Sequence, residues 1–300
     1  MEQTKRQDLP AEPGLWVVAT PIGNLEDLTA RARQALAHAD EVLCEDTRRT
    51  AQLLAALRLQ PRTSRLDAHA TPAQIARVVQ AMQTGKTYAL VTDAGTPGVS
   101  DPAAELVRAA HAEGVRVTPI PGPSAVTALL SVAGLAGSGF TFRGYFPRKN
   151  GERVEELETF MARAEREIWV WFESPERLQS TMEAIAHRLP YASLVAGKEL
   201  TKFHEKIFAD TAARATDAIS EELKNEGNLG EWCFALQLPR DFGDRKLESS
   251  DWVKALQCLL DVPLPASDAA RRISQAFGVA KKQVYEVALR LSGKKTEEGG

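Results

Sequence analysis

Residues 91–102 read VTDAGTPGVSDP and join an apolar run, Tyr88–Val91, to an amphipathic segment, Pro102–Ala112. The apolar run predicts a buried strand, and the amphipathic segment predicts a helix with Asp101 as its N-cap. The loop therefore follows the carboxyl end of a strand, where open α/β sheets bind their ligands. Its two glycines allow positive φ and close approach of a ligand to the backbone. The stretch predicts an α/β fold, and the loop is either a ligand site or a well-capped strand-to-helix connection.

Strand and helix patterns alternate through the first half of the chain, which favours a parallel sheet covered by helices. Strands are predicted at 15–19, 41–44, 66–69, 88–91 and 115–120, and helices from about 28 and at 51–57, 72–82, 102–112 and 126–135. A dinucleotide-binding fold would carry GxGxxG after its first strand. Residues 20–25 read TPIGNL and hold one glycine, so that fingerprint is absent.

Three of these strands end in unusual turns: TPIGN at 20–24, DAGTPGVSDP at 93–102 and PGPSA at 121–125. One such turn is ordinary, but three at one edge of one sheet predict a shared pocket. In the third turn, Ser124 is expected to cap the following helix.

A fourth strand end carries two acids, two arginines and two threonines, which read EDTRRT at 45–50. In one interpretation Asp46 or Thr47 caps the next helix and the arginines face water. In the other, the arginines hold a phosphate or carboxylate and an acid orders them. The residues alone leave both open.

Three glycines and a serine at 134–139 (GLAGSG) predict a domain boundary, so the first domain spans 14–136 and the second 140–238. The second begins with FTFRGYFPRK, whose basic and aromatic side chains either contact RNA or belong to a half-buried strand and a solvated loop. The segment KELTKFHE at 198–205 is either a solvated charged loop or a pocket wall. Further strands are predicted at 167–172, 193–196, 206–209 and 232–238, with helices at 175–187 and 211–223. Some of these strands have no helix between them, which predicts a mixed sheet.

After a polar linker at 239–250, residues 251–292 are predicted to form a small helical domain. A short helix at 252–260 precedes helices at 267–277 and 281–291, and the turn Gly278-Val279-Ala280 gives the outline of a helix-turn-helix. From Ala266 onward, seven basic and four acidic side chains give a net charge of +3. The pair therefore either contacts RNA or is a packing appendage. The arm 1–13 and the tail 293–300 are expected to be disordered.

The composition restricts the possible classes of protein. A net charge of -3 and an ordinary 44% hydrophobic content argue against coating of nucleic acid by bulk charge. Cys44, Cys233 and Cys258 are too widely spaced for a disulfide framework or a zinc site, so no metal is expected. No apolar run approaches the roughly 18 residues of a membrane span, and the first residues lack an apolar signal region, so a cytoplasmic protein is expected.

Seven segments, in this order and spacing, carry a resemblance to a known family. They are TPIGNLEDLT, CEDTRRT, VTDAGTPGVSDP, PGPSA, FRGYFPRK, FESPERL and KELTKFHE. The chain resembles the bacterial small-subunit ribosomal RNA 2'-O-ribose cytidine methyltransferases of the tetrapyrrole methylase superfamily. The resemblance covers residues 14 to about 238, and the terminal helix pair is similar to that family's C-terminal extension. It implies two α/β domains with S-adenosylmethionine in the cleft between them, a homodimer, and a cytidine ribose in the decoding region of 16S rRNA as acceptor, with no role for DNA or a membrane.

The resemblance also implies a role for individual residues. The cofactor would be bound by Pro21, Gly23, Asp93, Ala94, Gly95, Thr96, Pro97, Pro121, Gly122, Pro123 and Ser124. The expected catalytic residues are Glu45, Asp46, Arg48 and Glu199, of which either acid of the first pair or Glu199 is a candidate for a modest base. Substrate contacts are expected at Thr47, Arg49, Arg148, Lys149, Glu173, Lys198, Lys202, Arg271, Lys281 and Lys282.

The chain departs from the family pattern at Asp67-Ala68-His69-Ala70, where a His-rich segment is usual, and at Leu229-Gly230-Glu231, where a basic residue usually precedes the glycine. Both departures bear on the acceptor rather than on the methyl donor. Two alternatives to RNA methylation follow from the sequence: methylation of a tetrapyrrole or another small molecule, and a non-catalytic RNA-binding or ribosome-assembly factor. The EDTRRT cluster and the basic helix pair favour RNA, and the intact 93–97 loop favours an enzyme.

Overall fold

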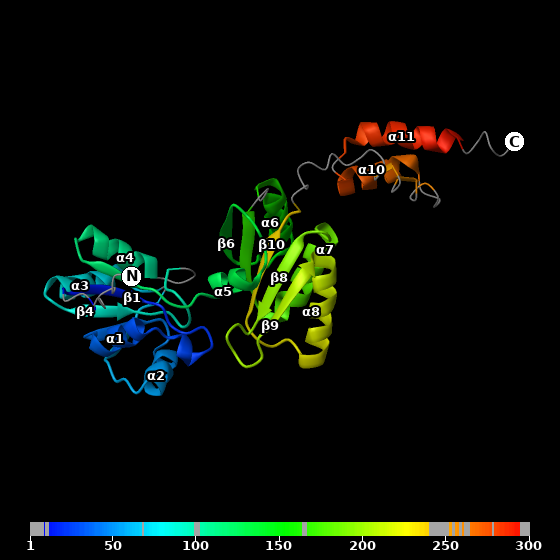
Figure 1. Cartoon of the computed structure of the whole chain (residues 1–300). Coiled ribbons are helices and arrows are strands. Elements are labelled where there is room, and N and C mark those ends of the chain that lie inside the picture. Colours follow the sequence, from blue (N-terminus) through cyan, green and yellow to red (C-terminus); the bar gives the residue numbers. More distant parts are fainter. Residues whose placement is uncertain are drawn as a thin grey trace, which may run out of the picture. The chain divides into compact units, whose positions relative to one another are not determined.

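The computed structural model describes residues 9, 12–67, 69–98, 103–163, 167–239, 252–253, 256–257, 260, 265–277 and 279–294. The chain divides into two compact units, Met1–Leu238 and Pro239–Gly300. The first unit contains two separate five-stranded sheets, each with its own helices, and the second is helical (Figure 1).

The first sheet has the order β3-β2-β4-β1-β5, and its strands are parallel as predicted. They are β1 (Gly14–Val18), β2 (Glu41–Cys44), β3 (Thr63–Arg65), β4 (Thr87–Leu90) and β5 (Val117–Ile120). Its helices are α1 (Ala30–His38), α2 (Thr47–Ala56), α3 (Pro72–Gln83) and α4 (Ala103–Ala112), with a 3-10 turn, η1 (Leu25–Asp27), before α1.

Alternate side chains of the strands face two hydrophobic cores. Trp16 and Val18 pack with α1 and α2 on one face, whereas Leu15 and Leu90 pack with α3 and α4 on the other. The sheet is therefore buried between two helix layers, as continuous apolar strands predict. β3 begins three residues before the strand predicted at 66–69, because this edge strand is polar and the buried Leu66 follows it.

Side chains at the helix starts explain where the first three α-helices begin. Thr29 Oγ1 accepts a hydrogen bond from Ala32 N in α1 (3.1 Å), Asp46 Oδ1 accepts one from Arg48 N in α2 (2.8 Å), and Thr71 forms a capping box in α3. Ser124 precedes α5 (Ala125–Val132), but its side chain makes no capping bond, so that prediction was wrong. The predicted caps of α4, Asp101 and Pro102, lie outside the described residues.

The second sheet has the order β6-β7-β10-β8-β9, in which β6 and β7 are parallel and the other pairs are antiparallel. Its strands are β6 (Gly139–Tyr145), β7 (Glu167–Glu173), β8 (Ser193–Lys198), β9 (Lys206–Thr211) and β10 (Trp232–Gln237). Its helices are α6 (Asn150–Arg163), α7 (Pro175–Arg188) and α8 (Ala212–Glu226). The predicted mixed sheet is confirmed. The prediction omitted α6, whose acidic sequence leaves only a narrow apolar stripe at Leu157 and Phe160.

The two faces of the second sheet are covered differently. Helices α6, α7 and α8 pack on one face over a core that contains Trp171 and Phe234. On the other face, α5 packs against Val170, Val195 and Ala235.

The second unit is built on a helix pair, α10 (Ala266–Phe277) and α11 (Lys281–Lys294), which matches the predicted helix-turn-helix outline. Ile273 and Val284 pack between the two helices with Trp252 and Leu256 from the preceding segment. The helix predicted at 252–260 is described only in part, and most of the predicted linker, the arm and the tail after Lys294 lie outside the described residues.

Candidate functional site

Hydrogen bonds fasten the three strand-end turns of the first sheet to one another. Thr20 and Gly95 exchange two backbone hydrogen bonds of 2.9 and 3.1 Å, which link the first turn to the second. The hydroxyl of Thr96 donates to the carbonyl of Pro123 at 2.9 Å, which links the second turn to the third. The carboxyl ends of β1, β4 and β5 therefore present one continuous backbone surface.

Glycine is required at two positions of this surface. Gly95 has a φ of +81°, and a Cβ there would lie 3.3 Å from Cγ2 of Ile22. At Gly122 a Cβ would lie 2.9 Å from the Cβ of Ala19 on the neighbouring turn. Side chains at these positions would separate the turns or fill the space between them.

A cavity of about 430 Å³ lies between these turns and the second sheet. This volume is within the range of small-molecule sites. The first domain contributes Ile22, Glu45, Arg49, Thr92, Asp93, Ala94, Gly95, Thr96, Ser124 and Ala125 to its lining. The second domain contributes Tyr145, Phe172, Glu173, Ser174, Pro175, Leu200, Gly230, Glu231, Trp232 and Cys233.

The EDTRRT cluster is divided between the cap of α2 and the cavity wall, and the binding of a phosphate or carboxylate by its arginines stays a prediction. Asp46 caps α2 and also binds the exposed guanidinium of Arg48 at 3.1 Å. Hydrogen bonds from the Arg48 side chain and backbone N–H lower the pKa of Asp46 to about 2. Arg49 instead forms an ion pair with Asp93 at 3.3 Å, and Arg49 and Glu45 line the cavity. Asp46, Thr47 and Arg48 are not among the lining residues.

Glu173 is a buried acid in the wall of the cavity, and its charge is compensated inside the second domain. Its carboxylate is paired with Arg177 and accepts a hydrogen bond from the hydroxyl of Thr181 at 2.6 Å. The strand end is thereby held firmly, which positions the neighbouring Phe172 and Ser174 in the cavity wall.

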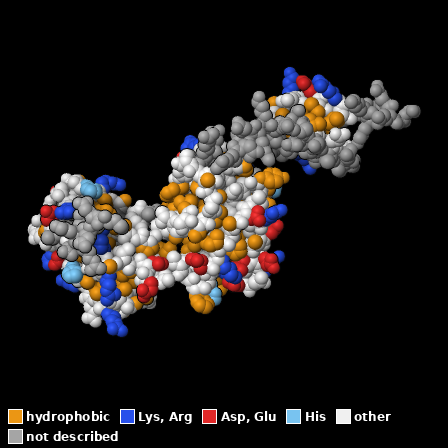
Figure 2. Space-filling model, viewed as in Figure 1, with side chains coloured by type: hydrophobic (Ala, Val, Ile, Leu, Met, Phe, Trp, Pro, Cys, Tyr) orange, Lys and Arg blue, Asp and Glu red, His pale blue; other side chains and the backbone are white. Residues whose placement is uncertain are grey.

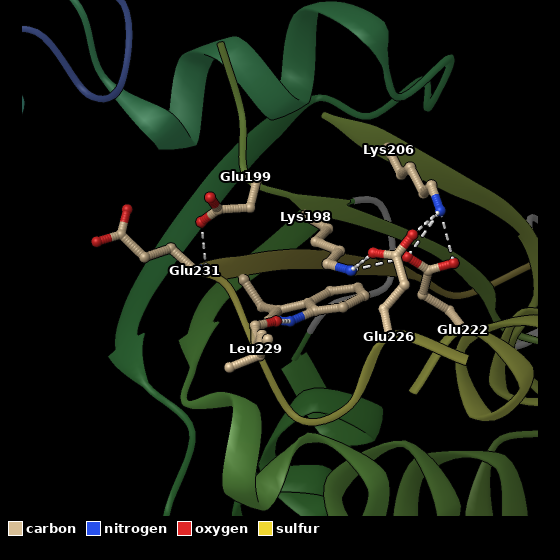
Figure 3. Close-up of polar contacts among 8 residues, drawn as sticks. Lys198, Glu199, Lys206, Glu222, Glu226, Leu229 and Glu231 are labelled. Carbon is tan, nitrogen blue, oxygen red and sulfur yellow. Dashed lines mark hydrogen bonds and ion pairs between the residues drawn. The ribbon is translucent and has the colours of Figure 1, made fainter. Parts of the chain in front are cut away.

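Lys198 points away from the cavity into a cluster of charges (Figure 3). Its ammonium lies 2.7 Å from Glu222 and 2.6 Å from Glu226, and Lys206 binds the same two carboxylates. Burial alone would lower the pKa of Lys198, but these hydrogen bonds raise it above its ordinary value. Lys198 does not line the cavity, so its contact with substrate stays a prediction.

Glu199 and Lys202 form a brace beside the cavity. Lys202 Nζ donates to Glu199 Oε1 at 2.8 Å. The same carboxylate accepts from the backbone N–H of Glu231 (Figure 3). Burial alone would raise the pKa of Glu199, but these bonds lower it below its ordinary value. A Cβ on Gly23 would lie 2.4 Å from Cγ of Lys202, so the first turn packs closely on this brace.

The remaining predicted residues lie outside the cavity lining. Pro21, Pro97, Pro121, Gly122 and Pro123 belong to the fastened turns. Arg148 is exposed, and Lys149 pairs with Glu152 at 3.0 Å. In the second unit, Arg271 pairs with Asp268, while Lys281 and Lys282 are exposed on α11.

The second-domain lining was largely missed from the sequence. Of this lining, Glu173 is among the predicted substrate contacts. Its neighbours Phe172, Ser174 and Pro175 were not predicted, although their strand end resembles the other strand-end turns. Trp232 and Cys233 gave no such signal, because they begin β10 and reach the site by antiparallel pairing with Glu173 and Phe172. Burial raises the pKa of the Cys233 thiol to about 12.

Within the described residues, no three His, Cys, Asp or Glu side chains gather in a way that would hold a metal ion. Over the same part of the chain, the helices are too short or too polar to cross a membrane.

Comparison with known proteins identifies the family. Residues 14–216 match the model of tetrapyrrole (corrin/porphyrin) methylases, and residues 247–292 match the RsmI C-terminal HTH domain. The chain belongs to the tetrapyrrole methylase family. Within this family it is similar to "Ribosomal RNA small subunit methyltransferase I" of Neisseria meningitidis serogroup B, with 38% identity over 93% of this chain and 94% of the relative. The protein of the same name from Mesorhizobium japonicum is 36% identical over 99% of both chains.

Solved structures confirm the fold of this tetrapyrrole methylase. Diphthine synthase superposes with a TM-score of 0.55 at 16% identity, over 77% of this chain and 93% of that chain. A uroporphyrin-III C-methyltransferase from Thermus thermophilus, in complex with S-adenosylhomocysteine, gives a TM-score of 0.50 at 16% identity over 74% and 96%. The two predicted α/β domains are thus those of the family, and the helix-turn-helix extension matches the separate RsmI C-terminal HTH domain.

Proposed function

We propose that this methyltransferase transfers the methyl group of S-adenosylmethionine to the ribose 2'-hydroxyl of a cytidine in the decoding region of 16S rRNA. The observation that carries the cofactor assignment is the fastening of three strand-end turns around a cavity of about 430 Å³. Membership in a methylase family, relatives named for ribosomal RNA and the terminal helix pair support the RNA substrate. The protein acts in the cytoplasm, where its RNA is located.

The residues present suit the proposed cofactor. Gly95 leaves its Cβ space open beside Ile22, and the Asp93–Thr96 backbone borders the cavity. Apolar side chains such as Leu200 and Phe172 face these polar groups, as in most cofactor sites. Asp93 to Thr96 and Ser124 are the residues that would hold S-adenosylmethionine, which supplies an electrophilic methyl group when bound.

The remaining lining residues bind and orient the acceptor. Methyl transfer requires a near-linear approach of the ribose oxygen, so positioning supplies most of the acceleration. Arg49 is held by Asp93 on one wall, and the exposed Tyr145 lies on the other. The cation binds an acceptor phosphate, the aromatic side chain of Tyr145 packs on the nucleoside, and the apolar wall excludes water.

We assign the removal of the 2'-hydroxyl proton to Glu45. Only it, among the three candidate bases, lines the cavity. The carboxylate of Asp46 is held by Arg48 and that of Glu199 by Lys202, and each has a pKa below its ordinary value. A carboxylate with a lowered pKa is a weaker base, so both are better suited to positioning.

The exposed apolar surface of the second domain supports the homodimer (Figure 2). Phe140 is 50% exposed and Ile207 is 37% exposed, and they lie on the two edge strands of the second sheet. Phe140 pairs with Ile168 and Ile207 pairs with Gly197, which places both on the face that carries α5. A second copy of the chain would cover this face.

Radiolabel transfer tests the activity. Small ribosomal subunits from a strain that lacks this modification are incubated with the protein and methyl-labelled S-adenosylmethionine, and the RNA is digested to nucleosides. Label in 2'-O-methylcytidine is the expected result, and Glu45→Gln should lower kcat while leaving cofactor affinity unchanged. Label on a base, or no transfer while S-adenosylmethionine binds, would refute the assignment of the acceptor. Absence of cofactor binding in calorimetry would refute the enzyme assignment itself.

A further inference from the structure

A second cavity, of about 550 Å³, lies at the β3 edge of the first domain. We call it the β3 groove. It lies between α3 and the strands β2, β3 and β4, and four basic side chains line it. They are Arg62 before β3, Arg65 in β3, Arg77 in α3 and Lys86 before β4. Four cations from three segments of the chain thus converge on one hollow.

Two of these cations are already paired. Lys86 Nζ lies 3.0 Å from Oδ1 of Asp40, and Arg65 Nη2 lies 2.5 Å from Oδ2 of Asp67. Glu41, the other acid of the groove, accepts a hydrogen bond from the hydroxyl of Ser64 and makes no ion pair with a described residue.

Arg62 and Arg77 differ from the other two cations. Both lie on the exposed walls of the groove, and neither guanidinium has a carboxylate partner among the described residues. Arg77 acts electrostatically on the hydroxyl of Tyr88, which belongs to the same lining. The fold therefore holds two uncompensated guanidinium groups at one cavity.

The chemistry of this groove suits a phosphate group. A guanidinium group presents several N–H donors in a planar fork and binds phosphate oxygens in pairs. The side-chain amide of Gln74 and the hydroxyl of Tyr88 add uncharged donors from the lining. We propose that the β3 groove binds a backbone phosphate of the RNA substrate, outside the cavity where the methyl group is transferred.

The position of the groove favours a polymer over a free nucleotide. Glu41 borders the groove, and Glu45, four residues further along β2 and the turn after it, lines the methyl-transfer cavity. Four residues of extended chain span about 13 Å. A stacked strand advances about 3.4 Å per nucleotide, so the two sites are about four nucleotides apart. An RNA strand reaches both sites, and a single nucleotide does not. This inference rests on the proposed RNA substrate.

A double variant, Arg62→Gln with Arg77→Gln, tests the proposal in the full-length protein. A matched control is Arg31→Gln with Arg108→Gln, which removes the same charge from exposed positions on α1 and α4 of the same domain. Binding of a fluorescent single-stranded RNA, of a decoding-region hairpin and of small subunits is measured at several salt concentrations. Cytidine monophosphate and inorganic phosphate serve as competitors. Thermal denaturation establishes that both variants fold.

The groove variant should bind RNA at least tenfold more weakly than the control variant. Its salt dependence, the slope of log K against log salt, should be shallower by about 0.7, the contribution of one phosphate contact to single-stranded RNA. Affinity for S-adenosylmethionine should equal that of the parent protein, and methyl transfer should show a raised KM with unchanged kcat.

Equal RNA affinity and equal salt dependence for the groove and control variants would overturn the proposal. Loss of competition by cytidine monophosphate with no change in RNA binding would also overturn it, because the groove would then serve free nucleotides. These binding measurements do not require turnover. A parent protein that binds RNA through the groove but transfers no label would refute the proposed function and leave this inference standing.

Discussion

Replacement of Lys198 by methionine separates a structural role of this residue from the substrate contact that the family pattern implies. The Lys198 side chain is 3% exposed and binds Glu222 and Glu226, while Lys206, 42% exposed, binds the same carboxylates from the solvent side (Figure 3). Methionine keeps the apolar stem and removes the charge. Lys206→Met is the matched control, because it removes an equal charge from the same cluster at an exposed position.

The expected loss of stability follows from burial. Removing one partner of a buried ion pair costs about 3–5 kcal/mol when the other charge is left unpaired. In Lys198→Met the two carboxylates keep Lys206, whose Nζ lies 2.8 Å from each of them, so we expect the lower limit of about 3 kcal/mol. For a unit of this size that corresponds to a Tm lower by about 6–12 °C. Lys206→Met should cost clearly less, because its partners remain bound to the buried Lys198.

Urea unfolding followed by tryptophan fluorescence reports on this cluster, because Trp232 packs beside it. The midpoint should fall more for Lys198→Met than for Lys206→Met, with an unchanged m-value. At a temperature where both variants are folded, RNA and S-adenosylmethionine should bind with parent affinity. Equal destabilisation by the two substitutions, or a tenfold loss of RNA affinity without loss of stability, would refute this reasoning.

Three further outcomes are expected. Gly95→Val should abolish calorimetric binding of S-adenosylmethionine, since the side chain would extend beside Ile22 at a φ of +81°; a Kd within threefold of the parent would contradict this. Cys233, whose pKa is raised to about 12 by burial, should react with a thiol reagent only on unfolding. Rapid labelling of Cys233 in the native protein would contradict this expectation. Lys198 and Lys206 lower the pKa of Glu226 from 4.5 to about 2. The stability that ionised Glu226 gains from these two lysines is therefore present above pH 4.5 and is lost as the pH falls toward 2. Acid titration of Lys206→Met should show a smaller loss over that interval.

The sequence predicted the first domain well because its strands are short, apolar and separated by helices. The turns after β1, β4 and β5 were recognisable from glycine and proline, whose backbone requirements are local. β3 was misplaced because an edge strand needs little apolar surface, and α6 was missed because its apolar stripe is narrow. A local sequence pattern identifies a strand or helix only where that element buries an apolar face.

The walls of the site were predictable to different degrees for a related reason. Asp93 to Thr96 are contiguous and form part of the cavity, so one segment of sequence carries the information. Trp232 joins Phe172 and Glu173 through the register of an antiparallel pair, which no local pattern specifies. Lys198 is the last residue of β8, whereas Glu199 follows the strand with a left-handed φ of +52°, and the two side chains make separate contacts. A motif that groups them therefore mixes a residue of the buried charge cluster with one of the brace beside the cavity.

The change of direction at the end of β8 also explains how the second domain holds a cavity wall made of loops. Within the strand, Lys198 binds Glu222 and Glu226 of α8. After the strand, Glu199 binds Lys202 and the backbone N–H of Glu231, so the loop before β10 is held at the cavity. The indole N–H of Trp232 donates to the carbonyl of Leu229 at 3.2 Å, which closes the same loop from within. Charged residues that do not line the cavity thus fix the position of those that do, which gives Lys198, Glu199 and Lys202 of the KELTKFHE segment a structural role.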